Sequence, residues 1–378
     1  MATTVTFYPV GNGDTSLVKL QNGRWVLLDF RHQAQGEDSS SPIIDLSKRL
    51  REELDAAARN EFDVVAFTHG DEDHIGGSTA FFHLDHSSKY QGGKRAKIRT
   101  LWVPAAMLLD KGADATECDE CDVWRKEARY RLKRNYGVRV FSRPQELEKW
   151  LQSVGLNLDD RRHLITDAGR CAPDFTLAAD GVEFFCHSPF VKHCEGGDAL
   201  RNESGLVFNV RFEVAGRRIQ YFAIGDADFS VLEDIVAITE VHRNEDRLDW
   251  HLYKAPHHSS YTALSSEKGA KETTPTDGVA KLLKRGQTGS YVVASCNPID
   301  DDEAAEQQTQ PPHIQAKRCY ATYLGLNRGR RVMVTMEEPN RTTPEPLIFE
   351  ITSFGLQPLG KPRSGAASVL MTPPPRAG

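Results

Sequence analysis

The sequence predicts an α/β protein in which helices cover layers of sheet. Short apolar runs with strand character alternate with longer segments whose apolar residues recur at helical spacing, such as 42–58 before the strand-like run 63–67. This alternation favours α/β layers. A chain of 378 residues, with 39% hydrophobic and 26% charged residues, is long enough to bury the core that such layers need.

The predicted elements begin with two N-terminal strands joined by a glycine-containing turn at 11–13, and a third strand ends at Asp29. Asp29 either supports a neighbouring loop or starts a turn. Strands are predicted at 5–10, 15–20, 24–29, 63–67, 100–104, 174–178, 182–187, 206–210, 219–224 and 291–296, with two more beyond 331. Helices are predicted at 42–58, 119–136 and 144–155. We expect one domain over 1–358, with a mobile acidic loop at 300–310, and a disordered tail at 359–378.

Residues 68–77 contain the densest group of candidate metal ligands. His69, Asp71, Asp73 and His74 fall within six residues at the end of a predicted strand, and glycines follow directly. Charged side chains and histidines are usually solvated, and a buried carboxylate needs a partner or a metal to offset its desolvation. The pattern therefore predicts a metal-binding loop rather than an ordinary polar loop.

The order His-x-Asp-x-Asp-His resembles the metal motif of the metallo-β-lactamase superfamily, usually His-x-His-x-Asp-His, with Asp71 replacing the second histidine. An aspartate at the position of Asp71 resembles the ComEC-type hydrolase branch of this superfamily, where it is common. Residues 10–16 and 26–29 resemble the opening hairpin of the same branch. The resemblance covers residues 5 to about 325, discontinuously. It implies an αββα sandwich, two mixed sheets flanked by helices, with the site along one sheet edge.

Two later stretches match the same family in the expected order. Gly-Asp-Ala at 225–227 resembles the turn whose aspartate bridges two metals, which makes Asp226 the bridging carboxylate and Asp228 its reserve. The stretch 253–260 resembles Leu-Lys-Val-Pro-His-His-Gly-Ser, and in it we expect His257 to be a ligand and His258 to face substrate or support the ligands. Lys254 is a substrate-binding candidate. A serine at 259 replaces the family's glycine, which leaves the conformation of that loop open.

Two more histidines have alternative roles. His187 follows an apolar strand, and the resemblance makes it a candidate ligand of the first metal, although a satisfied core histidine fits the sequence equally well. His313 follows two prolines at a predicted helix start. In a functional role, His313 would contact a phosphate or donate a proton to a leaving group. The alternative is an ordinary histidine at the start of a helix.

The resemblance implies a dinuclear hydrolase. One divalent ion would be held by His69, Asp71 and Asp226, with or without His187, and the other by Asp73, His74, Asp226 and His257. Two such ions about 4 Å apart lower the pKa of a bridging water and stabilise the entering and leaving oxygens. Asp71, in place of a histidine, shifts the preference from zinc toward manganese, with zinc as the alternative. Asp73, His258 and His313 are the expected catalytic residues.

The function implied by the resemblance is that of a metal-dependent phosphodiesterase, most simply a nuclease acting on DNA. The alternatives are hydrolysis of a small cyclic nucleotide or another ester, and a partner-binding subunit of a bacterial defence or mobile-element system. A helical insertion predicted at 108–172 supports a polymer substrate, because its helix carries basic residues beside Trp124 and Tyr130. These basic residues are Arg125, Lys126, Arg129, Arg131, Lys133 and Arg134. Of these, Arg129, Lys133 and Arg134 are the candidates for binding substrate. An ordinary solvated helix face explains the same composition, and 89–99 is a second basic segment.

Composition limits the remaining classes. A net charge of −6 argues against a general nucleic-acid coat protein. Seven scattered cysteines, in a chain with no recognisable secretory signal, indicate reduced thiols and a cytoplasmic location. Cys118 and Cys121 form a Cys-x-x-Cys pair without a second pair, which favours ordinary thiols over structural zinc. No apolar run approaches the ~20 residues of a membrane helix, so we do not expect the membrane transport associated with ComEC-type proteins.

Overall fold

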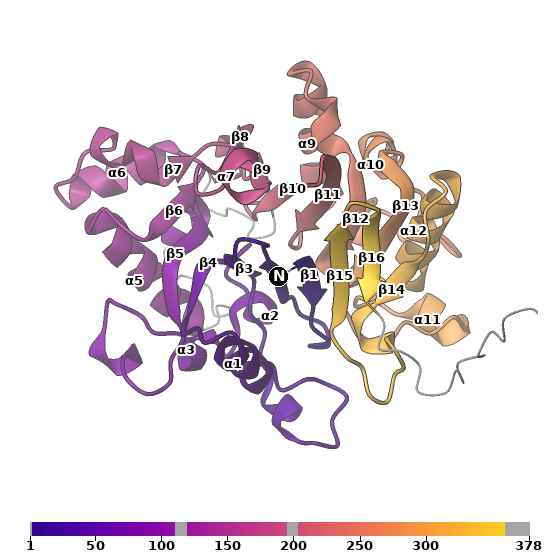
Figure 1. Ribbon diagram of the computed structural model, residues 1–378. Coiled ribbons are helices and arrows are strands. Elements are labelled where there is room, and N and C mark those ends of the chain that lie inside the picture. Colours follow the sequence, from indigo (N-terminus) through magenta and orange to yellow (C-terminus); the bar gives the residue numbers. More distant parts are fainter. Residues whose placement is uncertain (1, 110–118, 195–202, 360–378) are drawn as a thin grey trace, which may run out of the picture.

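The computed structural model describes residues 2–109, 119–194 and 203–359, which form two mixed sheets with helices on their outer sides (Figure 1). The nine-stranded sheet has the order β16-β15-β1-β2-β3-β4-β5-β6-β7, antiparallel from β16 to β3 and parallel from β3 to β7. Its strands are β16 (Gly355–Leu359), β15 (Leu347–Thr352), β1 (Thr3–Phe7), β2 (Ser16–Lys19), β3 (Trp25–Leu28), β4 (Glu61–Ala66), β5 (Lys97–Pro104), β6 (Val138–Phe141) and β7 (Ile165–Thr166).

The seven-stranded sheet has the order β14-β13-β12-β11-β10-β9-β8. Strands β11 to β14 are parallel, and β8 to β11 are antiparallel. The strands are β14 (Val332–Val334), β13 (Gly286–Ala294), β12 (Trp250–Ala255), β11 (Arg217–Ile224), β10 (Val207–Val214), β9 (Val182–Ser188) and β8 (Arg170–Cys171).

Helices cover the outer faces of the two sheets. On the nine-stranded sheet these are α1 (Leu46–Ala56), α3 (Ser78–Phe81), α4 (Ala105–Leu109), α5 (Asp119–Lys133) and α6 (Gln145–Ser153). On the seven-stranded sheet they are α9 (Phe229–Val241), α10 (Asp277–Leu283) and α12 (Ile314–Leu326). The other helices described are α2 (Glu72–Ile75), α7 (Leu177–Asp180), α8 (Val191–Cys194) and α11 (Glu303–Gln307). The 3-10 turns are η1 (Ala34–Glu37), η2 (Ser88–Tyr90), η3 (Asp159–Leu164), η4 (Glu245–Leu248), η5 (His257–Ser259), η6 (Tyr261–Ala263) and η7 (Thr335–Glu337).

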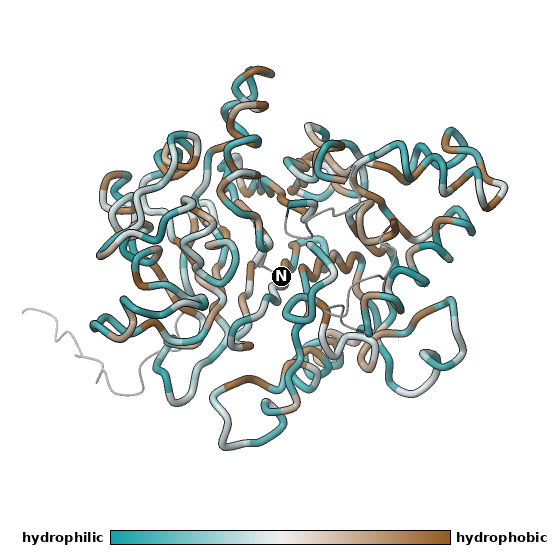
Figure 2. The backbone as a smooth tube through the Cα atoms, turned by 180° about the vertical axis from the view of Figure 1, so that it is seen from behind, coloured by the Kyte–Doolittle hydropathy of each residue, from teal (hydrophilic) through white to brown (hydrophobic). Residues whose placement is uncertain are grey.

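Apolar side chains form a layer between the sheets and one layer under each set of helices. Phe7 and Trp102 of one sheet meet Phe208 and Tyr221 of the other in the middle layer. Seen from behind, outer helices alternate between hydrophobic and hydrophilic residues along their length (Figure 2), as expected where one face is buried. The αββα sandwich of two mixed sheets is therefore confirmed.

The segment predicted as a helical insertion contributes to the nine-stranded sheet as well as to its helix layer. Strands β6 and β7 extend the sheet, and α5 buries Trp124 and Leu132 against it. Two predictions of local structure are wrong: 174–178 is not a strand, because Thr176 caps α7, and 300–310 contains α11, which Asp302 caps. The proposed tail beyond residue 359 lies outside the described residues. Among the helices described, none combines the length and apolar character needed to span a membrane.

Candidate metal centre

The loop after β4 carries the predicted metal motif to the edge where the two sheets meet. The Leu206 amide donates to the Thr68 carbonyl (2.9 Å), which ties this loop to the start of β10. From the other sheet, Gly225 comes so close that a Cβ on it would lie 2.6 Å from Thr68 Oγ1. The absence of a side chain at Gly225 thus allows Asp226 to approach the motif loop.

His74 is the centre of the site and is fully buried. Its Nε2 lies 3.0 Å from Asp226 Oδ1, and its Nδ1 lies 2.8 Å from Asp29 Oδ2. Asp29 also accepts hydrogen bonds from the amide and the hydroxyl of Thr68, each at 2.7 Å. A carboxylate on one ring nitrogen fixes the orientation of the other, as it does behind metal-binding histidines. Of the two roles open to Asp29, support of the neighbouring loop is the one the structure shows.

The other motif residues gather around His74. The ring centroids of His69 and His74 are 3.9 Å apart, and His69, Asp73 and His74 offer ligand atoms within 4.8 Å of one another. Asp71 is more exposed, with Oδ2 3.6 Å from His69 Nε2. All four predicted ligands of the motif are therefore brought together, with Asp71 and Asp73 toward solvent.

The paired histidines take the opposite places from those predicted. His258 is buried, with Nε2 3.0 Å from Asp73 Oδ2 and 3.6 Å from Asp226 Oδ2, whereas His257 is 29% exposed with Nε2 3.9 Å from Asp226. The Ser295 carbonyl lies 2.9 Å from Nδ1 of His258 and orients its ring. His258 therefore joins the ligand cluster, and His257 lies at its rim.

A left-handed turn causes this exchange. His257, His258 and Ser259 have φ angles of 48°, 51° and 64°, which turn successive side chains away from the positions that an extended segment would give them. The Ser260 amide donates to the His257 carbonyl (2.8 Å), and the His313 amide donates to the Ser259 carbonyl (3.0 Å). Ser259 thus adopts a conformation that glycine favours.

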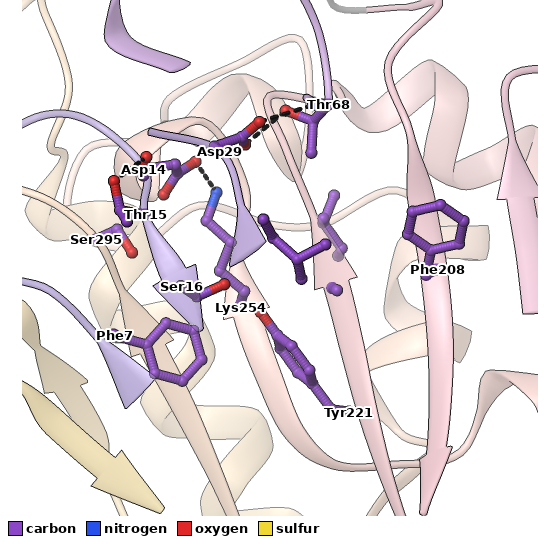
Figure 3. A pocket seen from close by; sticks show the side chains of 13 residues that line it. Phe7, Asp14, Thr15, Ser16, Asp29, Thr68, Phe208, Tyr221, Lys254 and Ser295 are labelled. Atoms are coloured by element: carbon purple, nitrogen blue, oxygen red, sulfur yellow. Dashed lines mark hydrogen bonds and ion pairs between the residues drawn. The ribbon is translucent and has the colours of Figure 1, made fainter. Parts of the chain in front are cut away.

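Asp14 is a site residue that sequence reasoning missed. It is buried and, with His74, Asp226 and His258, forms a second group whose ligand atoms lie within 4.8 Å of one another. Asp14 also forms an ion pair with Lys254, which is 5% exposed and points at it in Figure 3. Lys254 therefore balances charge inside the protein instead of presenting its ammonium to a substrate. The only sequence hint to Asp14 was its position in the Gly-x-Gly-Asp turn of the hairpin.

A small cavity of about 20 Å³ lies between the sheets, beside the Asp14–Lys254 pair (Figure 3). Asp14, Asp29, Thr68, Lys254 and Ser295 contribute to its polar lining, and apolar side chains of both sheets complete it. A cavity of this size with several polar partners suits one water molecule. Asp14 and Asp29 therefore border both this cavity and the histidines of the cluster.

Opposing effects set the protonation of the cluster. Burial lowers the pKa of His74, but the charges of Asp226 and Asp29 outweigh it and hold that pKa well above its usual value. The pKa of His258 is raised in the same way, with Asp226 and Asp73 opposing burial. Burial and the charge of His74 lower the pKa of His69. Burial raises the pKa of Asp226, but its histidine neighbours hold it well below the usual range.

The donor set fits a divalent metal ion. Within the described residues, His69 Nε2 and Asp14 Oδ1 are buried without a hydrogen bond, and His74 Nε2 and Asp226 Oδ1 are 3.0 Å apart and have no other hydrogen-bond partner. Buried polar atoms are nearly always hydrogen-bonded, so several such atoms converging on one place indicate a site for a cation. Imidazole nitrogens and carboxylate oxygens suit zinc and manganese. A bound ion would replace the protons that the carboxylates now hold on the histidines.

Other predicted site residues are not brought to the cluster. His187 faces away from the middle layer, because its neighbour Cys186 points into that layer and side chains alternate along β9. Its Nε2 lies 3.0 Å from the Arg247 carbonyl, its ring stacks on Phe222, and burial lowers its pKa to about 4. Of the two roles that the sequence allowed for His187, the structure shows that of a hydrogen-bonded core histidine. Asp228 accepts hydrogen bonds from backbone amides at the start of α9 and thus caps that helix.

His313 supports the histidine turn from behind. It directly precedes α12, is 1% exposed, and packs its ring 4.9 Å from that of Tyr261. Burial lowers its pKa. It belongs to neither ligand group, so its contacts assign it to the conformation of residues 257–259 rather than to the reacting atoms.

The basic residues of α5 divide into two sets. Arg125 and Arg131 are buried, which corrects the prediction that the whole cluster faces solvent. The three candidates for binding substrate lie toward the C-terminal end of the helix. Arg129 donates to the Leu108 carbonyl, Lys133 lies over Trp150, and Arg134 lies over Tyr130.

The N-terminal part of α5 contacts the motif loop, since a Cβ on Gly70 would lie 2.6 Å from Cys121 Sγ. At 1.5 Å per residue, Arg134 is then about 20 Å along the helix from that contact. The Cys118 half of the Cys-x-x-Cys pair lies outside the described residues.

The sequence matches no known protein family and no curated protein. Among solved structures, the chain is similar to a mutant of the CmlA beta-hydroxylase, with a TM-score of 0.41 and 10% identity over 92% of this chain and 54% of that one. It is also similar to a diphosphatase from the PhnP family, with a TM-score of 0.32 and 12% identity over 93% of this chain and 99% of that one. Similarities this low identify neither a family nor an activity.

Proposed function

We propose that the protein is a metal-dependent phosphodiesterase of the metallo-β-lactamase type, acting as a nuclease on DNA. The observation that carries this proposal is the convergence of His69, Asp73, His74, Asp226 and His258 at one sheet edge, from the loops after β4, β11 and β12. These residues are far apart in the sequence, yet their potential metal-ligand atoms lie close to one another. A purely structural role does not require that arrangement.

Two divalent ions, manganese or zinc, are the proposed cofactors. His69, Asp71 and Asp226 would hold one, and Asp73, His74, Asp226 and His258 the other. When bound, such ions supply Lewis-acid chemistry that lowers the pKa of a water and offsets charge on phosphoryl oxygens. Asp29 and the Ser295 carbonyl hold the rings of His74 and His258 so that their Nε2 atoms face the cluster.

His257 is the proposed proton donor. Its Nε2 lies 3.9 Å from Asp226 Oδ2 and its side chain is 29% exposed, so it contacts both the cluster and any substrate that covers it. Thr262 Oγ1 lies 3.4 Å from Nδ1 and limits the rotation of the ring. Donation from Nε2 to the leaving oxygen would complete cleavage of the P–O bond. A positioned acid of this kind contributes roughly 100-fold or more to a rate.

DNA is the proposed substrate because the exposed basic residues at the end of α5 are far enough from the cluster to contact a second part of a long phosphate backbone. Hydrolysis of a small nucleotide is the second candidate. It is favoured by a cavity beside the cluster, which is lined by Asn12, Gln33 and Asn297 among others.

The test combines metal analysis with hydrolysis. Protein exposed to manganese or zinc should contain two ions per chain and cleave bis(p-nitrophenyl) phosphate, single-stranded DNA or duplex DNA. Asp73→Ala and His74→Ala should lose metal and at least about 100-fold in rate, whereas Asp55→Ala, on the exposed face of α1, should lose neither. Metal content and hydrolysis that survive both site changes would disprove the proposed site. Cleavage of cyclic dinucleotides without cleavage of DNA would select the second candidate.

A further inference from the structure

A cavity of about 330 Å³ opens beside the metal cluster and has no assigned role. The side-chain amides of Asn12, Gln33, Gln35 and Asn297 line it, together with Ile43, Met336 and two prolines. Its volume is at the lower end of the range for small-molecule sites. None of the lining side chains is ionisable, which distinguishes the cavity from the charged cluster next to it.

Hydrogen bonds hold two of the four amide side chains in place. Asn12 donates from Nδ2 to the Pro311 carbonyl and accepts from the backbone amide of Asn297 at Oδ1, both at 2.9 Å. Gln33 donates from Nε2 to the Val10 carbonyl. The side chains of Gln33 and Asn297 converge over Gly11, where a Cβ would lie 3.1 Å from Gln33 Nε2 and 3.2 Å from Asn297 Oδ1. The part of the lining formed by Asn12 and Gln33 is therefore pre-organised.

The cavity is adjacent to the cluster along two separate segments. Asn12 precedes Asp14 by two residues, and Asn297 follows Ser295, whose carbonyl orients His258, by two residues. Two residues of chain span at most about 7 Å. The cavity is therefore within reach of a molecule whose phosphate lies at the metal cluster.

We propose that this cavity is a nucleobase-binding subsite of the phosphodiesterase site, a proposal that rests on the function proposed above. Each carboxamide offers a donor and an acceptor, the pattern displayed by the edges of the bases. Ile43 and Met336 supply apolar surface for a flat ring. The absence of basic side chains in the lining argues against a phosphate in the cavity itself. The phosphate belongs at the cluster, and the base belongs here.

The kinetic test uses two esters with the same leaving group, thymidine 5′-(p-nitrophenyl phosphate) and methyl p-nitrophenyl phosphate. Wild-type protein should prefer the thymidine ester, and Gln33→Leu combined with Asn297→Leu should reduce that preference on the order of tenfold. The rate on the methyl ester should stay within about twofold, since no cluster residue is changed. Gln152→Leu, an exposed amide on α6, is the matched control. Equal preference in wild-type and doubly substituted protein would overturn the subsite.

A binding test separates this proposal from the hydrolase proposal. Thymidine and adenosine should bind to the Asp73→Ala protein in NMR titrations at millimolar concentration, and binding should disappear when Gln33→Leu and Asn297→Leu are added to a protein with an unchanged melting temperature. Deoxyribose alone should not bind, and equal binding of the sugar would overturn the base assignment. Nucleoside binding without hydrolysis of any phosphodiester would support the subsite and refute the hydrolase. Hydrolysis with no preference for a base would do the reverse.

Discussion

The sheet edge that carries the metal motif and helix α5 are both rich in charged residues, but the charged side chains have different kinds of contacts in the two regions. At the edge, the loops that follow β1, β4, β11 and β12 bury carboxylates and histidines together. Among the described residues, potential metal-ligand atoms of His69 and Asp14 remain there without hydrogen bonds. On α5, each buried arginine has a carboxylate partner, although Nε of Arg125 makes no hydrogen bond to the part of the chain that the structure describes. Arg131 donates to Glu127 and to the carbonyls of Ile98 and Gly137.

The difference shows how a local charge pattern should be interpreted. Helical periodicity divides the basic residues of α5 between a buried and an exposed side, so composition overstates the surface that is free to bind a ligand. In the loop after β4, in contrast, buried histidines and half-exposed carboxylates turn their ligand atoms toward one place. The convergence of several such atoms, rather than charge density, separates a candidate metal site from a structural ion-pair network.

The largest effect is expected from the paired histidines of the edge. His258→Ala should lower metal occupancy and reduce phosphodiester hydrolysis on the order of 100-fold, because it removes a buried donor of the cluster. His257→Ala should retain the metal and lower the turnover number, since its ring lies at the rim. Metal content measured by elemental analysis, together with steady-state kinetics, distinguishes the two outcomes.

The exposed His242, at the end of α9, provides the matched control, and His242→Ala should change neither property. Loss of metal from the His257 variant combined with full occupancy in the His258 variant would restore the assignment that the sequence suggested. It would also show that the left-handed turn at 257–259 does not persist when metal binds.

A smaller effect, on stability alone, is expected from α5. Arg131→Ala should lower the free energy of unfolding by about 3 kcal/mol, because the fully buried Glu127 loses its guanidinium partner. The loss should lie at the lower limit for a buried pair, since Glu127 keeps the hydrogen bonds from the amides of Asp85 and His86. Lys133→Ala, two residues further and exposed, should change it by no more than about 0.5 kcal/mol. Chemical denaturation measures both. A loss below about 1 kcal/mol at Arg131 would remove the structural role and return that residue to the set of candidate ligand contacts.

Much of the fold and the heart of the site could be predicted because both depend on local patterns. Alternating strands and helices indicate layers, and the motif at 68–77 places four ligands on one short loop. Three features could not be predicted. The choice between His257 and His258 depends on a turn with left-handed φ angles, which serine does not favour. The orientation of His187 depends on which face of β9 meets the middle layer. The pair of Asp14 with Lys254 joins residues 240 positions apart.

The smallest effect concerns whether the exposed end of α5 contacts DNA at all. Arg129→Ala, Lys133→Ala and Arg134→Ala together should flatten the slope of log affinity against log salt by up to ~2–3 units. The reason is that fewer phosphate contacts form, so that fewer counterions leave the DNA on binding. The reduction should lie toward the lower limit, since Arg129 already donates to the Leu108 carbonyl. Hydrolysis of methyl p-nitrophenyl phosphate should not change, because Cys121, which contacts the motif loop, lies on the first turn of α5, before the three changed positions. An unchanged slope would place the polymer path elsewhere, with the basic segment 89–99 as the next candidate. No DNA binding by the wild-type protein at low salt would leave the small nucleotide as the substrate, because the basic end of α5 would then be an ordinary solvated helix end.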